Sequence, residues 1–201
     1  MGEVKDLYNN EVIYNNWITK VSRDGIDGLN QTNSDLIIQF IKDMSLGLNV
    51  SLMSPKGERS KGRLNRLKQK VIFAIRTLEA RGISDIRNVT QADIHQLFSD
   101  MRTGTLSTKE GLPYKSTGDY IKDFKTFWHW HQRVHKKKGI HVEDLTEELD
   151  ARGQKPKFVY FTADDFNVLV SHASFDMKLI MTLAFDSGVR VTELLNIKVS
   201  D

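Results

Sequence analysis

Apolar side chains recur at three- and four-residue steps along most of this chain, which is the spacing of one face of an α-helix. The clearest stripe precedes Gly82, a residue that favours a helix stop; its members are Leu64, Leu67, Val71, Ala74, Ile75 and Leu78. An earlier helix is predicted from Ser34, whose hydroxyl suits an N-cap, to Gly47. Each of these helices is expected to bury one face.

Two further helices are predicted in the same half of the chain. One starts at Thr90, with Asp93 three residues later in a variant of the capping box. The other starts with Ser116 and Asp119 as caps, and its apolar face comprises Tyr120, Phe124, Phe127, His131 and Val134. The aromatic run at 124–130 also suits base stacking in single-strand binders, but its helical spacing favours a role in the core.

The same pattern divides the chain into an irregular N-terminal lead-in at 1–32, a helical domain at 33–140, a linker at 141–157 and a second helical unit at 158–201. The linker is predicted from an acidic stretch followed by Gly and Pro. In the last unit, Thr162 and Asp165 form another capping box and Gly188 ends a helix. Because no stretch shows the alternation of a strand, the chain as given is predicted to be all-α.

Composition narrows the class of protein. With 39% hydrophobic and 27% charged residues among 201, the chain is expected to fold as a soluble globular protein. No apolar run has the roughly 18 to 20 residues of a membrane span, and no signal peptide is evident, so a cytoplasmic location is expected. The absence of cysteine excludes disulfides, thiolate metal sites and a cysteine nucleophile.

Charge is segregated along the chain, although the net charge is only +3. Projected as helices, 59–70 and 122–136 each present a basic face opposite the apolar one. Such faces suit phosphates and base edges in the major groove of DNA. The candidate DNA-binding residues are Arg59, Lys61, Arg63, Arg66, Lys70, Lys122, Lys125, Arg133 and Lys136. The alternative is that these side chains simply populate exposed helix faces.

Two features of these helices have other interpretations. Phe73 projects onto the polar side of its helix, which suits a partner contact or a departure from ideal geometry. His131 and His135 have the spacing of a helical zinc-protease motif, but Gln132 replaces the glutamate that would act as general base. Metalloprotease chemistry is therefore disfavoured, and no metal site is predicted.

The segment 183–201, LAFDSGVRVTELLNIKVSD, resembles the first catalytic box of tyrosine recombinases: a small residue, glycine, a hydrophobic residue and arginine, then Glu-Leu and a closing Asp. Gly188 permits the turn that ends one helix, and Glu193 lies one turn beyond Arg190. The resemblance implies that Arg190 is the first catalytic arginine, which grips the scissile phosphate, and that Glu193 supports it. A permanently charged, bidentate side chain suits that task.

The resemblance extends upstream. Residues 160–165 are similar to the lead-in of the family's catalytic domain, and the four helices before them match its core-binding domain in number and order. The implied fold is a four-helix SAM-like core-binding domain followed by the first helices of an α+β catalytic domain. Segments 111–115 and 127–130 are most similar to archaeal integrase-like members.

The implied function is site-specific DNA integration and recombination, by strand cleavage and rejoining through a 3′-phosphotyrosyl intermediate. Implied partners are double-stranded DNA and other recombinase protomers, with no cofactor, metal, membrane or small-molecule substrate. All tyrosines precede Arg190, so no nucleophile is assigned, and this chain alone is expected to bind DNA without cleaving it. Two alternatives stay open: a non-enzymatic DNA-binding regulator or excision factor, and a helical protein-interaction domain.

Overall fold

The computed structural model describes residues 8–50, 57–152, 160–195 and 197. These residues are helices and loops without a strand, which confirms the all-α prediction for this part of the chain. One compact unit spans Asn10–Gln154, and α6 to α8 belong to another. The helices are α1 Asn10–Asp24, α2 Gln31–Leu46, α3 Lys61–Ala80, the 3-10 helix η1 Ile86–Asn88, α4 Gln91–Thr103, α5 Thr117–Lys136, α6 Ala163–Ser171, α7 Phe175–Ser187 and α8 Val191–Leu194.

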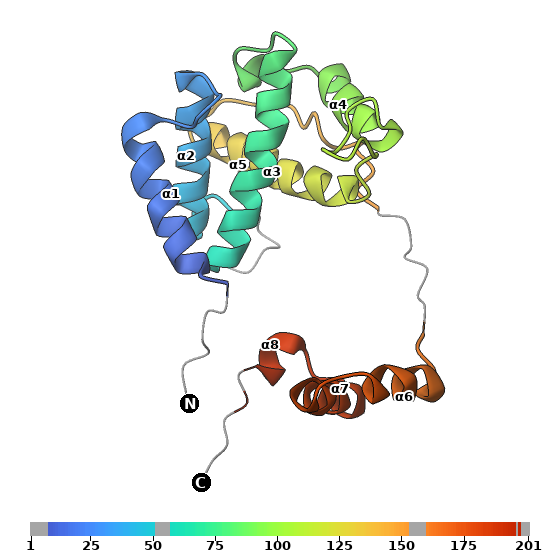
Figure 1. Cartoon of the computed structure of the whole chain (residues 1–201). Helices are drawn as coiled ribbons and strands as arrows, with labels where there is room; N and C mark the ends of the chain where they lie inside the picture. The colour runs from blue at the N-terminus through green and yellow to red at the C-terminus, as the bar shows by residue number, and fades with distance from the viewer. Residues whose placement is uncertain (1–7, 51–56, 153–159, 196, 198–201) are drawn as a thin grey trace. The chain divides into compact units, whose positions relative to one another are not determined.

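Helix α3 is the centre of the first unit. It contacts α1, α2, α4 and α5, and Figure 1 shows it between the α1–α2 pair and α4. Its predicted apolar stripe is buried from Leu64 to Leu78. A stripe that meets four neighbours supplies most of the apolar burial that stabilises such a bundle. None of the helices in the described ranges has the length and apolarity that a membrane crossing requires.

The structure confirms one of the predicted helix N-caps in the first unit and contradicts others. The Thr90–Asp93 capping box is confirmed: Thr90 N donates to Asp93 Oδ2 at 2.9 Å, and Asp93 N donates to Thr90 Oγ1 at 3.2 Å. The predicted N-cap at Ser34 is wrong, because α2 begins three residues earlier with Asn30 as its cap. The buried Ser34 hydroxyl instead accepts from Ile26 N at 3.1 Å. Ser116 precedes α5 but makes no side-chain cap.

The N-terminal prediction is also wrong, because Asn10–Asp24 forms helix α1 within the expected irregular lead-in; residues 1–7 lie outside the described residues. Tyr14 and Val21 are buried against the rest of the unit. Lysines of α3 cover two aromatic rings: Lys61 Nζ lies 5.0 Å from the centre of the Tyr14 ring, and Lys68 Nζ lies 4.7 Å from that of Trp17. Weak apolar periodicity is sufficient here because contacts with α3 stabilise the helix.

The first part of the predicted linker is packed rather than extended between units. We call residues 141–152 the return segment, since they run back along α5. Trp128 Nε1 donates to Glu143 O at 2.9 Å, and Thr146 and Leu149 are buried. A buried indole N–H needs an acceptor, and the return segment supplies one. The rest of the predicted linker, 153–157, lies outside the described residues.

The aromatic side chains of α5 form core, as their spacing predicted. Phe127 packs edge-on against Phe40 of α2 with ring centres 5.3 Å apart, and Phe124 packs against Phe98 of α4 at 5.7 Å. Phe73 is also covered: its ring lies 5.5 Å from that of Tyr114 and 5.3 Å from that of Tyr120. The loop before α5 therefore extends the core over a face of α3 that the projection left polar.

In the other unit, the predicted Thr162–Asp165 capping box opens α6, and Gly188 at φ 61° ends α7. The rings of Phe166 and Phe185 stack at 4.1 Å. Neither α6 nor α7 contains a buried residue. Their large apolar side chains are exposed; they include Val168, Leu169, Phe175, Met177, Leu179, Ile180, Leu183 and Phe185.

Candidate nucleic-acid interface

Basic residues of α3 converge on one carboxylate of α5. Arg63 Nη1 lies 2.8 Å from Asp123 Oδ1, while Arg66 Nε and Lys70 Nζ lie 3.4 and 3.7 Å from Asp123 Oδ2. The Asp123 side chain is only 1% exposed. Part of the predicted basic face is thus engaged in ion pairs within the protein.

Burial makes the charged form of the Asp123 carboxyl less favourable than it is in water. Burial raises the pKa of this carboxyl above its usual range, although the nearby cations Arg66 and Lys70 act to lower it. Removing one partner of such a buried group strongly disfavours the fold, since it leaves an uncompensated charge. Sequence reasoning missed Asp123, yet a signal existed: it lies one turn before the core residue Phe127, on a face expected to be buried.

A hollow lies between the start of α3 and the second half of α5, and several cations line it. Three adjoining depressions share their walls: one is lined by Arg59, Arg63 and His129, another by His129, Arg133 and Lys136, and a third by Asn49, Arg133 and Lys136. We call their combined surface the α3–α5 hollow, lined by Asn49, Arg59, Arg63, His129, Arg133 and Lys136. Arg59, Arg133 and Lys136 have no ion-pair partner among the described residues.

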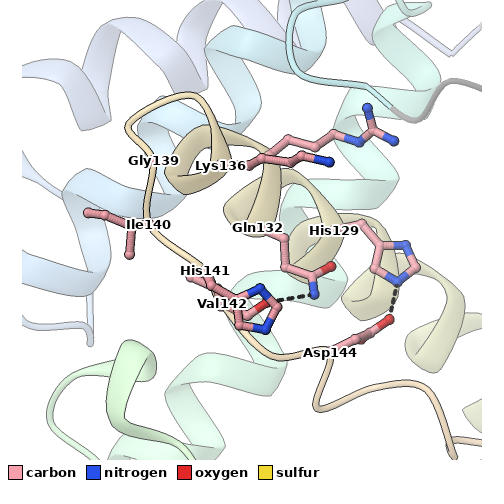
Figure 2. Close-up of a pocket in the computed structure, with 9 residues that line it drawn as sticks. His129, Gln132, Lys136, Gly139, Ile140, His141, Val142 and Asp144 are labelled. Carbon is pink, nitrogen blue, oxygen red and sulfur yellow. Dashed lines mark hydrogen bonds and ion pairs between the residues drawn. The ribbon is translucent and has the colours of Figure 1, made fainter.

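The largest of these depressions is a groove of about 690 Å³ between the end of α5 and the return segment. Figure 2 shows His129 and Gln132 of α5 directed toward that segment. His129 Nε2 lies 2.9 Å from Asp144 Oδ2, and Gln132 Nε2 donates to Val142 O at 3.1 Å. One wall of the groove is therefore cationic and the other contains a carboxylate.

Acidic residues of the return segment limit the basic face of α5. Burial raises the pKa of Asp144, but hydrogen bonds from Thr146 and the contact with His129 outweigh it and lower the pKa below its usual range. Lys125 Nζ donates to Glu147 O at 3.4 Å. The proximity of this segment reduces the positive potential beside Lys125, so the residues nearer the end of α5 carry more of the unopposed charge.

The remaining candidates are divided between other surfaces. Lys61 faces α1 and pairs with Glu58 at 2.8 Å. Lys122 Nζ lies 3.7 Å from Asp119 Oδ1 on the exposed side of α5. The nine residues predicted to bind DNA therefore form no single face: some line the α3–α5 hollow, some surround Asp123 and some lie elsewhere.

Comparison with protein-family models, curated proteins and solved structures finds no match. The assignment of the candidate site residues therefore depends on their geometry in this structure and on the sequence resemblance.

Arg190 and Glu193, the predicted catalytic pair, contact each other at the start of α8. Arg190 N donates to Glu193 Oε2 at 3.0 Å, so the carboxylate caps the helix. Glu193 Oε1 lies 3.9 Å from Arg190 Nη1, and the Arg190 side chain is 86% exposed. An exposed pair at this distance orients the guanidinium only weakly, which leaves it accessible to an anion. The closing Asp201 of the box lies outside the described residues.

The two histidines of the protease-like spacing lie at the edge of the core. The rings of His131 and His135 are 4.2 Å apart, and His135 Nδ1 lies 3.0 Å from His131 O. Burial lowers the pKa of His131 to about 4, with smaller contributions from His135 and Arg87. Within the described parts of the chain, no three His, Asp or Glu side chains gather at a spacing that would hold a metal ion.

Proposed function

We propose that the α1–α5 unit binds double-stranded DNA through the α3–α5 hollow, as the core-binding domain of a tyrosine-recombinase-type integrase. The observation that carries the DNA proposal is the position of Arg59 on one side of the hollow and of Arg133 and Lys136 on the other, none of them with an ion-pair partner in the described parts of the chain. Cations from two crossing helices can neutralise phosphates on a shared stretch of backbone.

The ion pairs at Asp123 support the same proposal in a different way. They tie α3 to α5 beside the hollow, which Arg63 also lines, and so fix the relative positions of the unpaired cations. Preorganised donors lose less conformational entropy when a ligand binds. Fixed positions suit a DNA-binding helix pair, because the phosphates of a duplex are themselves spaced at fixed intervals.

The catalytic part of the proposal rests on the sequence resemblance. In it, Arg190 contacts the scissile phosphate, Glu193 supports Arg190, and the reaction proceeds on DNA assembled with other protomers. The exposed guanidinium of Arg190 is compatible with a phosphate ligand. No tyrosine of this chain is assigned as nucleophile.

The test is fluorescence anisotropy of the full chain with a labelled duplex across a salt series. Affinity should fall steeply with salt, with a slope of about −0.9 per phosphate contact. The triple variant Arg59→Gln, Arg133→Gln and Lys136→Gln should lower the slope by about three and the affinity at low salt by more than tenfold. The matched control is Lys20→Gln, Lys42→Gln and Lys109→Gln, which removes the same charge from other surfaces.

The outcomes separate the competing functions. Equal losses in both triple variants would show that net charge alone drives binding and would reject the α3–α5 hollow as the interface. An absence of binding by the wild-type chain at low salt would reject DNA as the partner and favour a protein-interaction bundle.

A further inference from the structure

The smallest part of the α3–α5 hollow has the features of a site for a single anion. It is a pocket of about 180 Å³ between Asn49 and Val50 after α2, the start of α3 and the second half of α5. Arg59, just before the N-cap of α3, and Arg63, in its first turn, line one side of it. Thr126 and His129 of α5 line the other. Two guanidinium groups and an imidazole thus share a space far smaller than the neighbouring groove.

One polar atom at this pocket lacks a hydrogen-bond partner among the described residues, and another is held only by an ion pair. Arg63 Nη1 is buried and makes no hydrogen bond, although Asp123 Oδ1 lies 2.8 Å away in an ion pair. Asn49 Oδ1 is buried and has no donor, while its amide nitrogen is fixed by a 2.7 Å hydrogen bond to Asp43 Oδ2. Buried polar groups without partners cost free energy, so a ligand with acceptor oxygens and an accompanying water would stabilise this arrangement.

Size and charge together select the ligand. Since one water takes up about 30 Å³, the pocket has room for a phosphate group with a few waters but not for a whole nucleotide. Arginine forks match the oxygens of phosphate in a bidentate manner. Arg59 has no ion-pair partner within the described ranges and is available for this, and Asp123, which Arg66 and Lys70 share, offsets only part of the positive charge of Arg63.

We infer that this pocket binds one phosphate group through Arg59, Arg63 and His129. The inference deepens the proposed DNA-binding function, on which the choice of a backbone phosphate as the source rests. One phosphate held in a pocket fixes the register of α3 and α5 on the duplex, whereas cations on an open surface tolerate sliding. The free anion and the DNA phosphate share the same chemistry and are distinguished by experiment.

The first arm of the test uses inorganic phosphate alone with the full chain. Side-chain Nε signals of Arg59 and Arg63 and ring signals of His129 should shift and saturate in an NMR titration. Arg59→Gln should weaken this binding at least tenfold, Arg59→Lys less, and Lys109→Gln, on the loop between α4 and α5, should leave it unchanged. Arg59 precedes the cap of α3, so circular dichroism should stay helical. Shifts that do not saturate, or that persist equally in Arg59→Gln, overturn the pocket.

The second arm replaces single DNA phosphates by neutral methylphosphonates along the duplex. At one position per bound unit, the replacement should weaken wild-type binding much more than binding of Arg59→Gln, because that variant has already lost most of the contact. A scan in which every position affects both proteins equally overturns the assignment to DNA phosphate. Saturable binding of inorganic phosphate without any DNA binding would keep the pocket, assign it to a free phosphate and refute the proposed function instead.

Discussion

Arg63 of α3 and Asp123 of α5 form a 2.8 Å ion pair in which the carboxylate is almost fully buried, so a residue predicted to contact DNA also holds two helices together. Arg66 and Lys70 of α3 lie within 3.4 and 3.7 Å of the other oxygen of the same carboxylate. The pairing links the stability of the fold to the charge available on its surface.

Asp123→Asn is therefore expected to affect stability and DNA binding in opposite directions. Three cations lose their shared carboxylate, and the free energy of unfolding should fall by about 1 to 3 kcal/mol. The same cations become available to phosphate, and at low salt this gain should outweigh the loss of preorganisation, so DNA affinity should rise and the salt slope should steepen by about one. Urea unfolding and anisotropy measure the two effects. In Asp119→Asn, an exposed control, both should be smaller; a loss of DNA affinity in Asp123→Asn would contradict the prediction.

The buried His131 predicts a loss of stability in acid. Its folded pKa of about 4 lies below the ordinary value of 6.5, so the unfolded chain binds the proton more tightly between these values. Stability from this group is present above about pH 6.5 and is lost as the pH falls toward 4, by on the order of 3 kcal/mol. Asp85 opposes this effect, while His135 and Arg87 add to it.

His131→Leu tests that interpretation, because neither ring nitrogen of His131 makes a hydrogen bond to any residue that the structure describes. The variant should have near wild-type stability at pH 7.5 and a smaller decline between pH 6.5 and 4.5 in urea unfolding. His141→Gln, on the exposed loop after α5, is the control and should decline as the wild type does. An unchanged decline in His131→Leu would assign the acid sensitivity to another group.

The return segment and α1 are predicted to be integral to the first unit. A fragment of residues 10–152 should unfold cooperatively, whereas 33–140, the domain boundaries expected from the sequence, should be far less stable or unfolded. Leu149→Ala alone should cost about 2 kcal/mol, since it removes a buried leucine at the edge of the core. Thermal unfolding followed by circular dichroism compares these chains. Equal stability of the two fragments would show that the added contacts contribute little.

The exposed apolar side chains of α6 and α7 predict self-association of the full chain, because association would remove them from water. Light scattering after size exclusion should give a mass that rises with concentration for residues 1–201 and stays monomeric for 10–152. Leu179→Ser combined with Leu183→Ser should reduce the association. Concentration-independent monomers of the full chain would contradict this.

Arg190→Gln addresses the predicted catalytic arginine without requiring catalysis. If Arg190 contacts a phosphate, the variant should lower the salt slope of DNA binding by about one. Lys178→Gln, on α7 of the same unit, removes an equal charge as the control. Identical slopes for Arg190→Gln and the wild type would show that Arg190 makes no phosphate contact in the complex formed by this chain.

The sequence by itself determined the features that depend on neighbours a few residues away. The stripe from Leu64 to Leu78, the capping boxes at Thr90 and Thr162, and the helix stop at Gly188 are such features, because helical periodicity and capping are local interactions. The cationic sides of α3 and α5 were visible for the same reason. The tertiary structure decided what those features contact.

Only the fold brings Asp123 to Arg63, covers Phe73 with Tyr114 and Tyr120, and lays the return segment on Trp128. It also makes a helix of α1, whose own periodicity is weak, by packing it on α3. Whether a cation is free or paired depends on which distant side chain folding places beside it. The sequence pattern carries no record of that distance, so the candidate DNA-binding residues were identifiable by type, but their division among different surfaces was not.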